Sequence, residues 1–180
     1  MNMQNQLLRY FAAEKAESVV FVLMGVVALG ASVWLWRTGS SYRGMMWPLG
    51  LIAFIQLGVG GAIFLRTDGQ VAALTAQLAS APEAYQAAEV ARMEVVMRSF
   101  ALYKLIELAL FALGVGLTYA FRHRETVYAV GIGLVLQASL MLVADLFAEK
   151  RGDEYLEQVR ALRAPVSATV MPLQAGSGTP

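Results

Sequence analysis

Charged side chains that could do chemistry occur inside apolar stretches of this sequence. Lys104 and Glu107 lie early in the apolar segment 99–121, and Asp145 lies near the end of the segment 127–147, followed by Glu149. Carboxylate and ammonium groups in such surroundings can form ion pairs, line a cavity for a proton or ion, or act as a general acid or base. These residues are therefore the first candidates for a functional site.

Several other chemistries are excluded by residue type. The chain has no cysteine, so thiolate catalysis, disulfides and cysteine metal sites are ruled out. Its one histidine, His123, lies in a short basic turn, where a solvated residue is a better interpretation than a metal ligand. Phosphate-binding glycine loops, zinc-binding helix motifs and nucleophile elbows do not occur in the sequence. We expect no cofactor or metal and favour a non-enzymatic protein.

Composition indicates a membrane protein. Of 180 residues, 58% are apolar and only 15% are charged, and the mean hydropathy is +0.56, which is too apolar for an ordinary soluble domain. The formal net charge of +1 offers no large field for nucleic acid, so we expect no nucleic-acid partner. The lipid bilayer is the first partner that the sequence predicts.

Four apolar segments are each long enough to cross a bilayer, which takes about 20 residues. They lie at 18–36, 45–65, 99–121 and 127–147, and they are continuously apolar rather than alternating, which favours helices over a barrel. The first and third connections are short. The predicted fold class is an all-α integral membrane protein with four transmembrane helices in two hairpins, forming one domain over residues 1–164.

The middle connection, 66–98, has a pattern of its own. Residues 70–98 carry helical spacing that is interrupted near Ser80, and Pro82 followed by Glu83 is a helix-start signal. We therefore predict one long helix over 82–121 that projects by about 25 Å from the bilayer. Helix should also continue after Phe147 to Leu162. The polar segment 165–180 is predicted to be a flexible tail.

The charged residues of the apolar segments gather on one side of the predicted membrane. Four crossings place both chain ends and the middle connection on the same side, so connectivity brings together one cluster: Glu14, Lys15, Glu17, Arg66, Lys104, Glu107, Asp145 and Glu149. Structural ion pairing is the leading interpretation, and Lys104 and Glu107 could pair within one helix. A ligand or ion cavity comes second and catalysis third.

The tripeptide Ala-Glu-Lys occurs at both ends of the membrane region, at 13–15 and 148–150. Both copies should lie on the same side of the membrane, so Glu14, Lys15, Glu149 and Lys150 are predicted to cross-pair and clamp the first helix to the last. An internal duplication is a weaker hypothesis. Lys15 and Gly25 align with Lys104 and Gly114, but Gln56 and Gln137 need a different offset.

Two further sets of residues are predicted to make contacts. Gln56 and Gln137 lie near the middle of their segments, where hydrogen bonds between helices are a better interpretation than a solute site. Glu89, Met93 and Met97 share one helical face outside the membrane, and we predict that they form an adaptable surface for a partner. Glycines at 25, 58, 60, 61, 131 and 133 should allow close helix packing.

Orientation follows from the basic residues near the predicted helix ends. The side with both termini carries Arg9, Lys15, Arg66, Arg92, Arg98, Lys150, Arg151, Arg160 and Arg163, and the other side carries Arg37, Arg43, Arg122 and Arg124. The positive-inside rule then predicts that both termini lie in the cytoplasm. By analogy of size and helix number, we expect a bacterial-type inner (plasma) membrane protein.

Three functions stay open at this point. The leading hypothesis is assembly or partner binding through the charged cluster and the projecting helix, with a second copy or another membrane protein as the partner. The first alternative is a proton- or ion-coupled transporter or channel with a polar cavity around Lys104, Glu107 and Asp145. The second is an enzyme that acts on lipid and uses Glu107 or Asp145 as a general acid or base.

Overall fold

The computed structural model of the chain describes residues 2–162. Within them, four long helices follow one another: α1 (Met3–Thr38), α2 (Met46–Ser80), α3 (Pro82–Ala120) and α4 (Glu125–Arg160), with a short 3-10 helix, η1 (Arg43–Met45), before α2. All four are long and apolar enough to cross a membrane, which confirms the helical class and the number of candidate spans. The predicted tail, 165–180, and the last two residues of the predicted domain lie outside the described residues.

The helix starts and stops follow from local chemistry. α3 begins at Pro82 with Glu83 in its first turn and runs unbroken to Ala120, as predicted. Proline loses no hydrogen bond in the first turn of a helix, and a carboxylate there interacts favourably with the helix dipole. α1 ends at Gly39, whose φ of 61° lies in the left-handed region that glycine adopts without strain.

All four helices are longer than a bilayer requires. They contain 35 to 39 residues, so each is roughly 52–58 Å long, compared with about 30 Å for a hydrocarbon core. The Thr67-Asp-Gly sequence does not interrupt α2, which continues to Ser80. The extension of α3 beyond its apolar segment is therefore not a lone projecting helix, because the other three helices extend beside it.

These extensions pack together, and we call them the terminal-side bundle: residues 3–17, 66–80, 82–98 and 148–160. Its core contains Leu7 and Phe11 of α1, Tyr85 of α3 and Val159 of α4, all fully buried. Leu74 of α2, among others, packs against this core. Apolar side chains therefore continue along the inside of the helices well past the candidate membrane spans.

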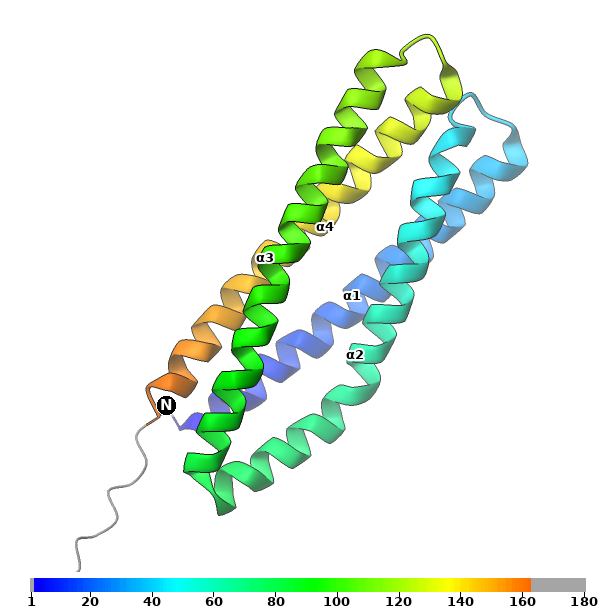
Figure 1. Cartoon of the computed structure of the whole chain (residues 1–180). Helices are drawn as coiled ribbons and strands as arrows, with labels where there is room; N and C mark the ends of the chain where they lie inside the picture. The colour runs from blue at the N-terminus through cyan, green and yellow to red at the C-terminus, as the bar shows by residue number, and fades with distance from the viewer. Residues whose placement is uncertain (1, 163–180) are drawn as a thin grey trace, which may run out of the picture.

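The helices pack most extensively as two neighbouring pairs, α1 with α2 and α3 with α4. The short turns that join the members of each pair lie at one end of the molecule, which we call the turn end (Figure 1). The N-terminus, the end of α4 and the α2–α3 junction lie at the opposite end, the terminal end (Figure 1). The two pairs also meet, since Gly133 of α4 approaches Pro48 of α2.

Glycines permit the close approach inside each pair. A Cβ atom at Gly25 would lie 3.1 Å from the carbonyl oxygen of Ala53 in α2, and one at Gly114 would lie 2.8 Å from that of Gly131 in α4. Real Cβ atoms are not found at the shorter distance, so α3 and α4 need glycine at this crossing. Gly58 and Gly61 were wrongly predicted to take part, because a Cβ there meets nothing within 4 Å in the described structure.

Gly114→Val is expected to lower the free energy of unfolding by about 1–3 kcal/mol, because the new side chain forces α3 away from α4. Gly116→Val is the matched control, since its Cβ would meet no described atom within 4 Å and the change in helix propensity is the same. Unfolding of both variants in detergent, followed by circular dichroism, measures the difference. Equal destabilisation by the two substitutions would mean that the glycine contact is unimportant.

Candidate functional site

Lys104 forms its ion pair across the α3–α4 pair. Its Nζ atom donates to both carboxylate oxygens of Glu149, each at 2.7 Å. The alternative that Lys104 pairs with Glu107 within α3 is therefore wrong. Glu107 is buried between the helices, whereas the long Lys104 side chain extends toward the terminal end, where Glu149 offers a partly solvated partner.

Glu107 is a buried carboxyl group without a hydrogen-bond partner. Only 4% of the residue is exposed, and neither carboxylate oxygen is hydrogen-bonded within residues 2–162. Its electrostatic neighbour is Asp145 of α4, a second carboxyl group. Burying a charged group without compensation costs several kcal/mol or more, so two adjacent carboxyl groups in apolar surroundings call for a functional explanation.

A second set of ion pairs joins α1 to α2. Lys15 Nζ lies 2.6 Å from a carboxylate oxygen of Asp68, and it also lies over the ring of Phe64 at 4.8 Å. Arg66 approaches Glu14 at 3.5 Å. The predicted cluster members Glu14, Lys15 and Arg66 thus do come together near the terminal ends of the apolar segments, and they hold the first helix pair.

Glu14 is a partly buried carboxyl group just before the apolar segment 18–36. Its Oε2 atom is buried and has no hydrogen-bond partner in the described part of the chain. Burial raises the pKa of the Glu14 carboxyl, and the positive charges of Arg66, Arg92 and Arg151 oppose that rise. These three arginines come from α2, α3 and α4, so Glu14 faces the centre of the bundle.

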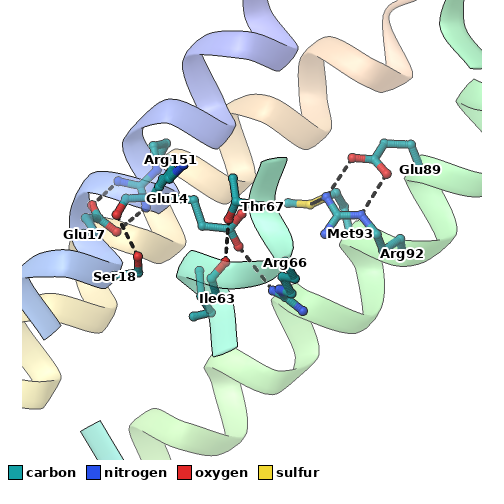
Figure 2. Close-up of polar contacts among 11 residues, drawn as sticks. Glu14, Glu17, Ser18, Ile63, Arg66, Thr67, Glu89, Arg92, Met93 and Arg151 are labelled. Atoms are coloured by element: carbon teal, nitrogen blue, oxygen red, sulfur yellow. Dashed lines mark hydrogen bonds and ion pairs between the residues drawn. The ribbon is translucent and has the colours of Figure 1, made fainter. Parts of the chain in front are cut away.

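Glu17 and Arg151 clamp α1 to α4. Both terminal nitrogens of Arg151 donate to the two carboxylate oxygens of Glu17 (Figure 2). A bidentate pair of this kind fixes orientation as well as distance, so it sets the register of the first helix against the last. Arg151 directly follows the second Ala-Glu-Lys tripeptide.

The predicted cross-pairing of the two Ala-Glu-Lys tripeptides is wrong in its residues. Glu14 pairs with Arg66, Lys15 with Asp68 and Glu149 with Lys104, so each of these bonds lies within one helix pair. Lys150 is exposed. The ion pair that does join the two helix pairs is made by residues just after the tripeptides, Glu17 and Arg151.

A buried polar network lies in the terminal-side bundle. Arg92 makes a bidentate contact with Glu89 at 2.8 and 2.7 Å (Figure 2). Tyr155 donates its hydroxyl to Glu89 at 3.0 Å, and the Tyr85 and Tyr155 hydroxyls are 2.8 Å apart. Tyr10 stacks on Tyr155 with ring centroids 4.2 Å apart. Glu89 is thus fully hydrogen-bonded, in contrast to Glu107.

Glu89, Met93 and Met97 do not form the exposed partner surface that we predicted. Glu89 and Met93 are buried, and Met97 packs partly buried against the same core. The reason is that the inward face of α3 keeps its direction beyond the apolar segment, where α1, α2 and α4 continue to cover it. A partner cannot reach this face in the folded chain.

The two helix pairs are built alike at several positions. In each, a lysine of the first helix bonds a carboxylate of the second, as Lys15–Asp68 and Lys104–Glu149. The same number of positions separates Asp68 from Glu149 and Gln56 from Gln137. The duplication hypothesis thus gains a structural parallel, with one offset for the first helices and another for the second.

Gln56 and Gln137 are buried without the expected polar contacts. They are 0% and 2% exposed. Within the described residues, both amide atoms of Gln56 and the amide nitrogen of Gln137 have no hydrogen-bond partner. They do not act as hydrogen-bonded links between the helices.

Sequence reasoning did not single out Arg92, Tyr155 or Arg151 as members of a polar network. Arg92 follows Glu89 by three positions, a spacing that brings side chains together on a helix, so this pair had a local signal. Arg151 had no such signal, since its partner Glu17 lies at the other end of the chain.

The chain does not resemble a known protein closely enough to transfer a function. Comparison with protein-family models, with curated proteins and with solved structures finds no significant match. Within residues 2–162, no group of three or more His, Asp or Glu side chains is arranged to hold a metal ion.

Proposed function

We propose that this chain is a multi-pass membrane protein in which Glu107 and Asp145 bind and release a proton as part of proton conduction across the membrane. The observation that carries the proposal is the burial of both Glu107 carboxylate oxygens without a hydrogen-bond partner in the described chain, next to a second carboxyl group. Ionisable residues with this placement in membrane helices commonly mark ion or proton sites.

The proposed membrane position follows from the helices. The apolar segments 18–36, 45–65, 99–121 and 127–147 would cross the bilayer as two hairpins, with the terminal-side bundle in the cytoplasm. Trp34, Trp36 and Trp47 are more than half exposed near the turn end, as expected of aromatic side chains at a membrane interface. The basic residues favour the opposite, terminal end as the cytoplasmic side.

The chemistry needs only the residues of the α3–α4 pair. Two ionised carboxylates side by side repel each other, and one proton bound between them removes that repulsion. The Lys104–Glu149 ion pair lies one helical turn nearer the terminal end and is partly solvated. It is thus placed between the carboxyl pair and water, where a proton from water can pass to a Glu107 or Asp145 oxygen and return.

The other two functions have less support. Partner binding was motivated by the methionine face, which is buried in the bundle. A lipid enzyme needs room for substrate beside its carboxylates, and neither the hollow at Tyr10 and Tyr155 nor the apolar groove at Trp34 is lined by Glu107 or Asp145.

Proton flux in reconstituted vesicles tests the proposal. Purified protein in liposomes with a trapped pH dye should conduct protons under an imposed pH gradient, and Glu107→Gln should reduce the rate at least tenfold, because an amide cannot take up the proton. Glu94→Gln is the control, since Glu94 is exposed and pairs with Arg160 on the bundle surface. Absence of flux above empty liposomes, or equal flux in Glu107→Gln, would refute the transport function.

Membrane orientation can be tested separately, because the chain contains no cysteine. Ser41→Cys lies in the turn after α1 and Ser80→Cys ends α2, and both positions are exposed. A membrane-impermeant maleimide added to intact cells should label position 41 and leave position 80 unlabelled until the cells are lysed. The reverse pattern would place the termini outside.

A further inference from the structure

An apolar groove lies on the half of the molecule near the turn end. It has a volume of about 640 Å³ and is lined by α1, the η1 region, the start of α2 and the middle of α4. Apolar side chains such as Leu23, Val27 and Leu140 form most of its surface, and Trp34 lies along it. The groove is separate from the carboxyl pair, since neither Glu107 nor Asp145 lines it.

One polar group, Gln137, stands out among the lining residues near the centre of the membrane segment. Its residue is 2% exposed, and its amide nitrogen has no hydrogen-bond partner among residues 2–162. A buried amide without a partner is costly, and a ligand group can supply the missing bond. Rotation about the last side-chain torsion presents either the N–H or the C=O of the amide to a ligand.

Gln56 does not supply that partner in the structure. Gly44 lies against Thr126 and Ala129, and Pro48 lies against Gly133, so α2 and α4 run parallel and in contact near the turn end. Gln56 does not line the groove, and its own amide has no hydrogen-bond partner in the described chain either.

The depth of Gln137 restricts what can bind. In the proposed membrane position, Gln137 is at the middle of the segment 127–147, about 15 Å from either end by helix rise. The ester groups of phospholipids lie in the interfacial region outside a hydrocarbon core of about 30 Å, so their acyl chains bring no hydrogen-bonding group to this depth. The ligand must carry its polar group within an apolar body.

We propose that the groove binds a lipid-soluble molecule of the quinone class, with a ring oxygen hydrogen-bonded to the Gln137 amide. A quinone oxygen accepts a hydrogen bond and a quinol hydroxyl can donate one, so a primary amide can serve either form. The inference rests on the membrane position proposed above but not on proton binding by Glu107.

Quenching of Trp34 fluorescence tests the groove directly. In a Trp36→Phe, Trp47→Phe background reconstituted in nanodiscs, Trp34 is the remaining tryptophan. A benzoquinone with a decyl tail should quench it saturably. Gln137→Leu should weaken the apparent affinity about tenfold, the usual effect of losing one hydrogen bond. Gln137→Asn, which keeps an amide, should retain more affinity, and Gln56→Leu should leave it unchanged.

Several results would overturn the inference. Quenching that rises linearly with quinone and is equal in Gln137→Leu would indicate simple partition into the lipid. Equal competition by decylbenzene, which has no ring oxygen, would indicate an unspecific apolar slot. An equal loss of affinity in Gln56→Leu would mean that the Gln56 and Gln137 amides pair with each other. If native mass spectrometry shows a dimer and Trp34 is not quenched in that dimer, the groove would be assigned to a second copy of the chain. Glu107→Gln should keep quinone binding, so failure of the transport function leaves this test intact.

Discussion

Glu89→Ala is expected to lower the free energy of unfolding by about 3–5 kcal/mol, because it leaves a charged partner without its counter-ion inside the bundle. Glu89 is 1% exposed and accepts both hydrogen bonds from Arg92 and one from Tyr155. Removing the Glu89 carboxylate leaves both Arg92 and Tyr155 without that hydrogen-bond acceptor. The arginine charge would also remain over the ring of Phe11, at 5.5 Å, without its hydrogen-bonded carboxylate.

The matched control for this prediction is Glu94→Ala, also in α3. Glu94 pairs with Arg160 at 2.8 Å, but both side chains are well exposed. Exposed ion pairs contribute about 0–1 kcal/mol, so this variant should unfold almost like the parent protein. Chemical unfolding in detergent, followed by circular dichroism, compares the two. Similar losses would show that burial of the Glu89 network contributes little.

Glu107→Leu is expected to raise the free energy of unfolding by about 1–4 kcal/mol at neutral pH, while it abolishes proton flux. A buried polar group without a partner costs about 1–3 kcal/mol, and more if it is charged, so an apolar side chain of similar volume relieves that cost. Neither carboxylate oxygen of Glu107 meets a hydrogen-bond partner in residues 2–162, and the neighbouring side chain is the Asp145 carboxyl. Stability and function should therefore move in opposite directions here.

Glu149→Leu is the comparison variant, for which we expect a lower rather than a higher free energy of unfolding. It removes the carboxylate that accepts both hydrogen bonds from Lys104, and it should lower stability by about 1 kcal/mol because this pair is partly solvated. Thermal unfolding of both variants in the same detergent shows whether each substitution raises or lowers the stability. A destabilised Glu107→Leu protein would mean that Glu107 makes a favourable contact, and the carboxyl pair would then be structural.

Local features of the chain were sufficient to predict the helices. Pro82 and Glu83 start α3 where they were expected to, and the four apolar segments, except Met45 and Phe121 at their ends, lie inside the four α-helices. These features act over one or two helical turns, through backbone hydrogen bonds, caps and apolar continuity, so a single sequence contains them. The order of the helices along the chain determines which helix ends lie together. It was therefore enough to predict that Glu14, Lys15 and Arg66 lie near one another.

Only the tertiary structure decided which residues pair and which remain alone. Lys15 bonds Asp68 rather than a residue of the last helix, and Glu17 bonds Arg151, because a rotation of about 100° per residue and the register of packed helices select each partner. Met93 was expected at a surface and is in the core for a similar reason, namely that four extensions pack together. Glu107 lacks a hydrogen-bond partner within the described residues because Lys104 turns toward Glu149. Partner choice depends on relative helix rotation and depth, which no local pattern encodes.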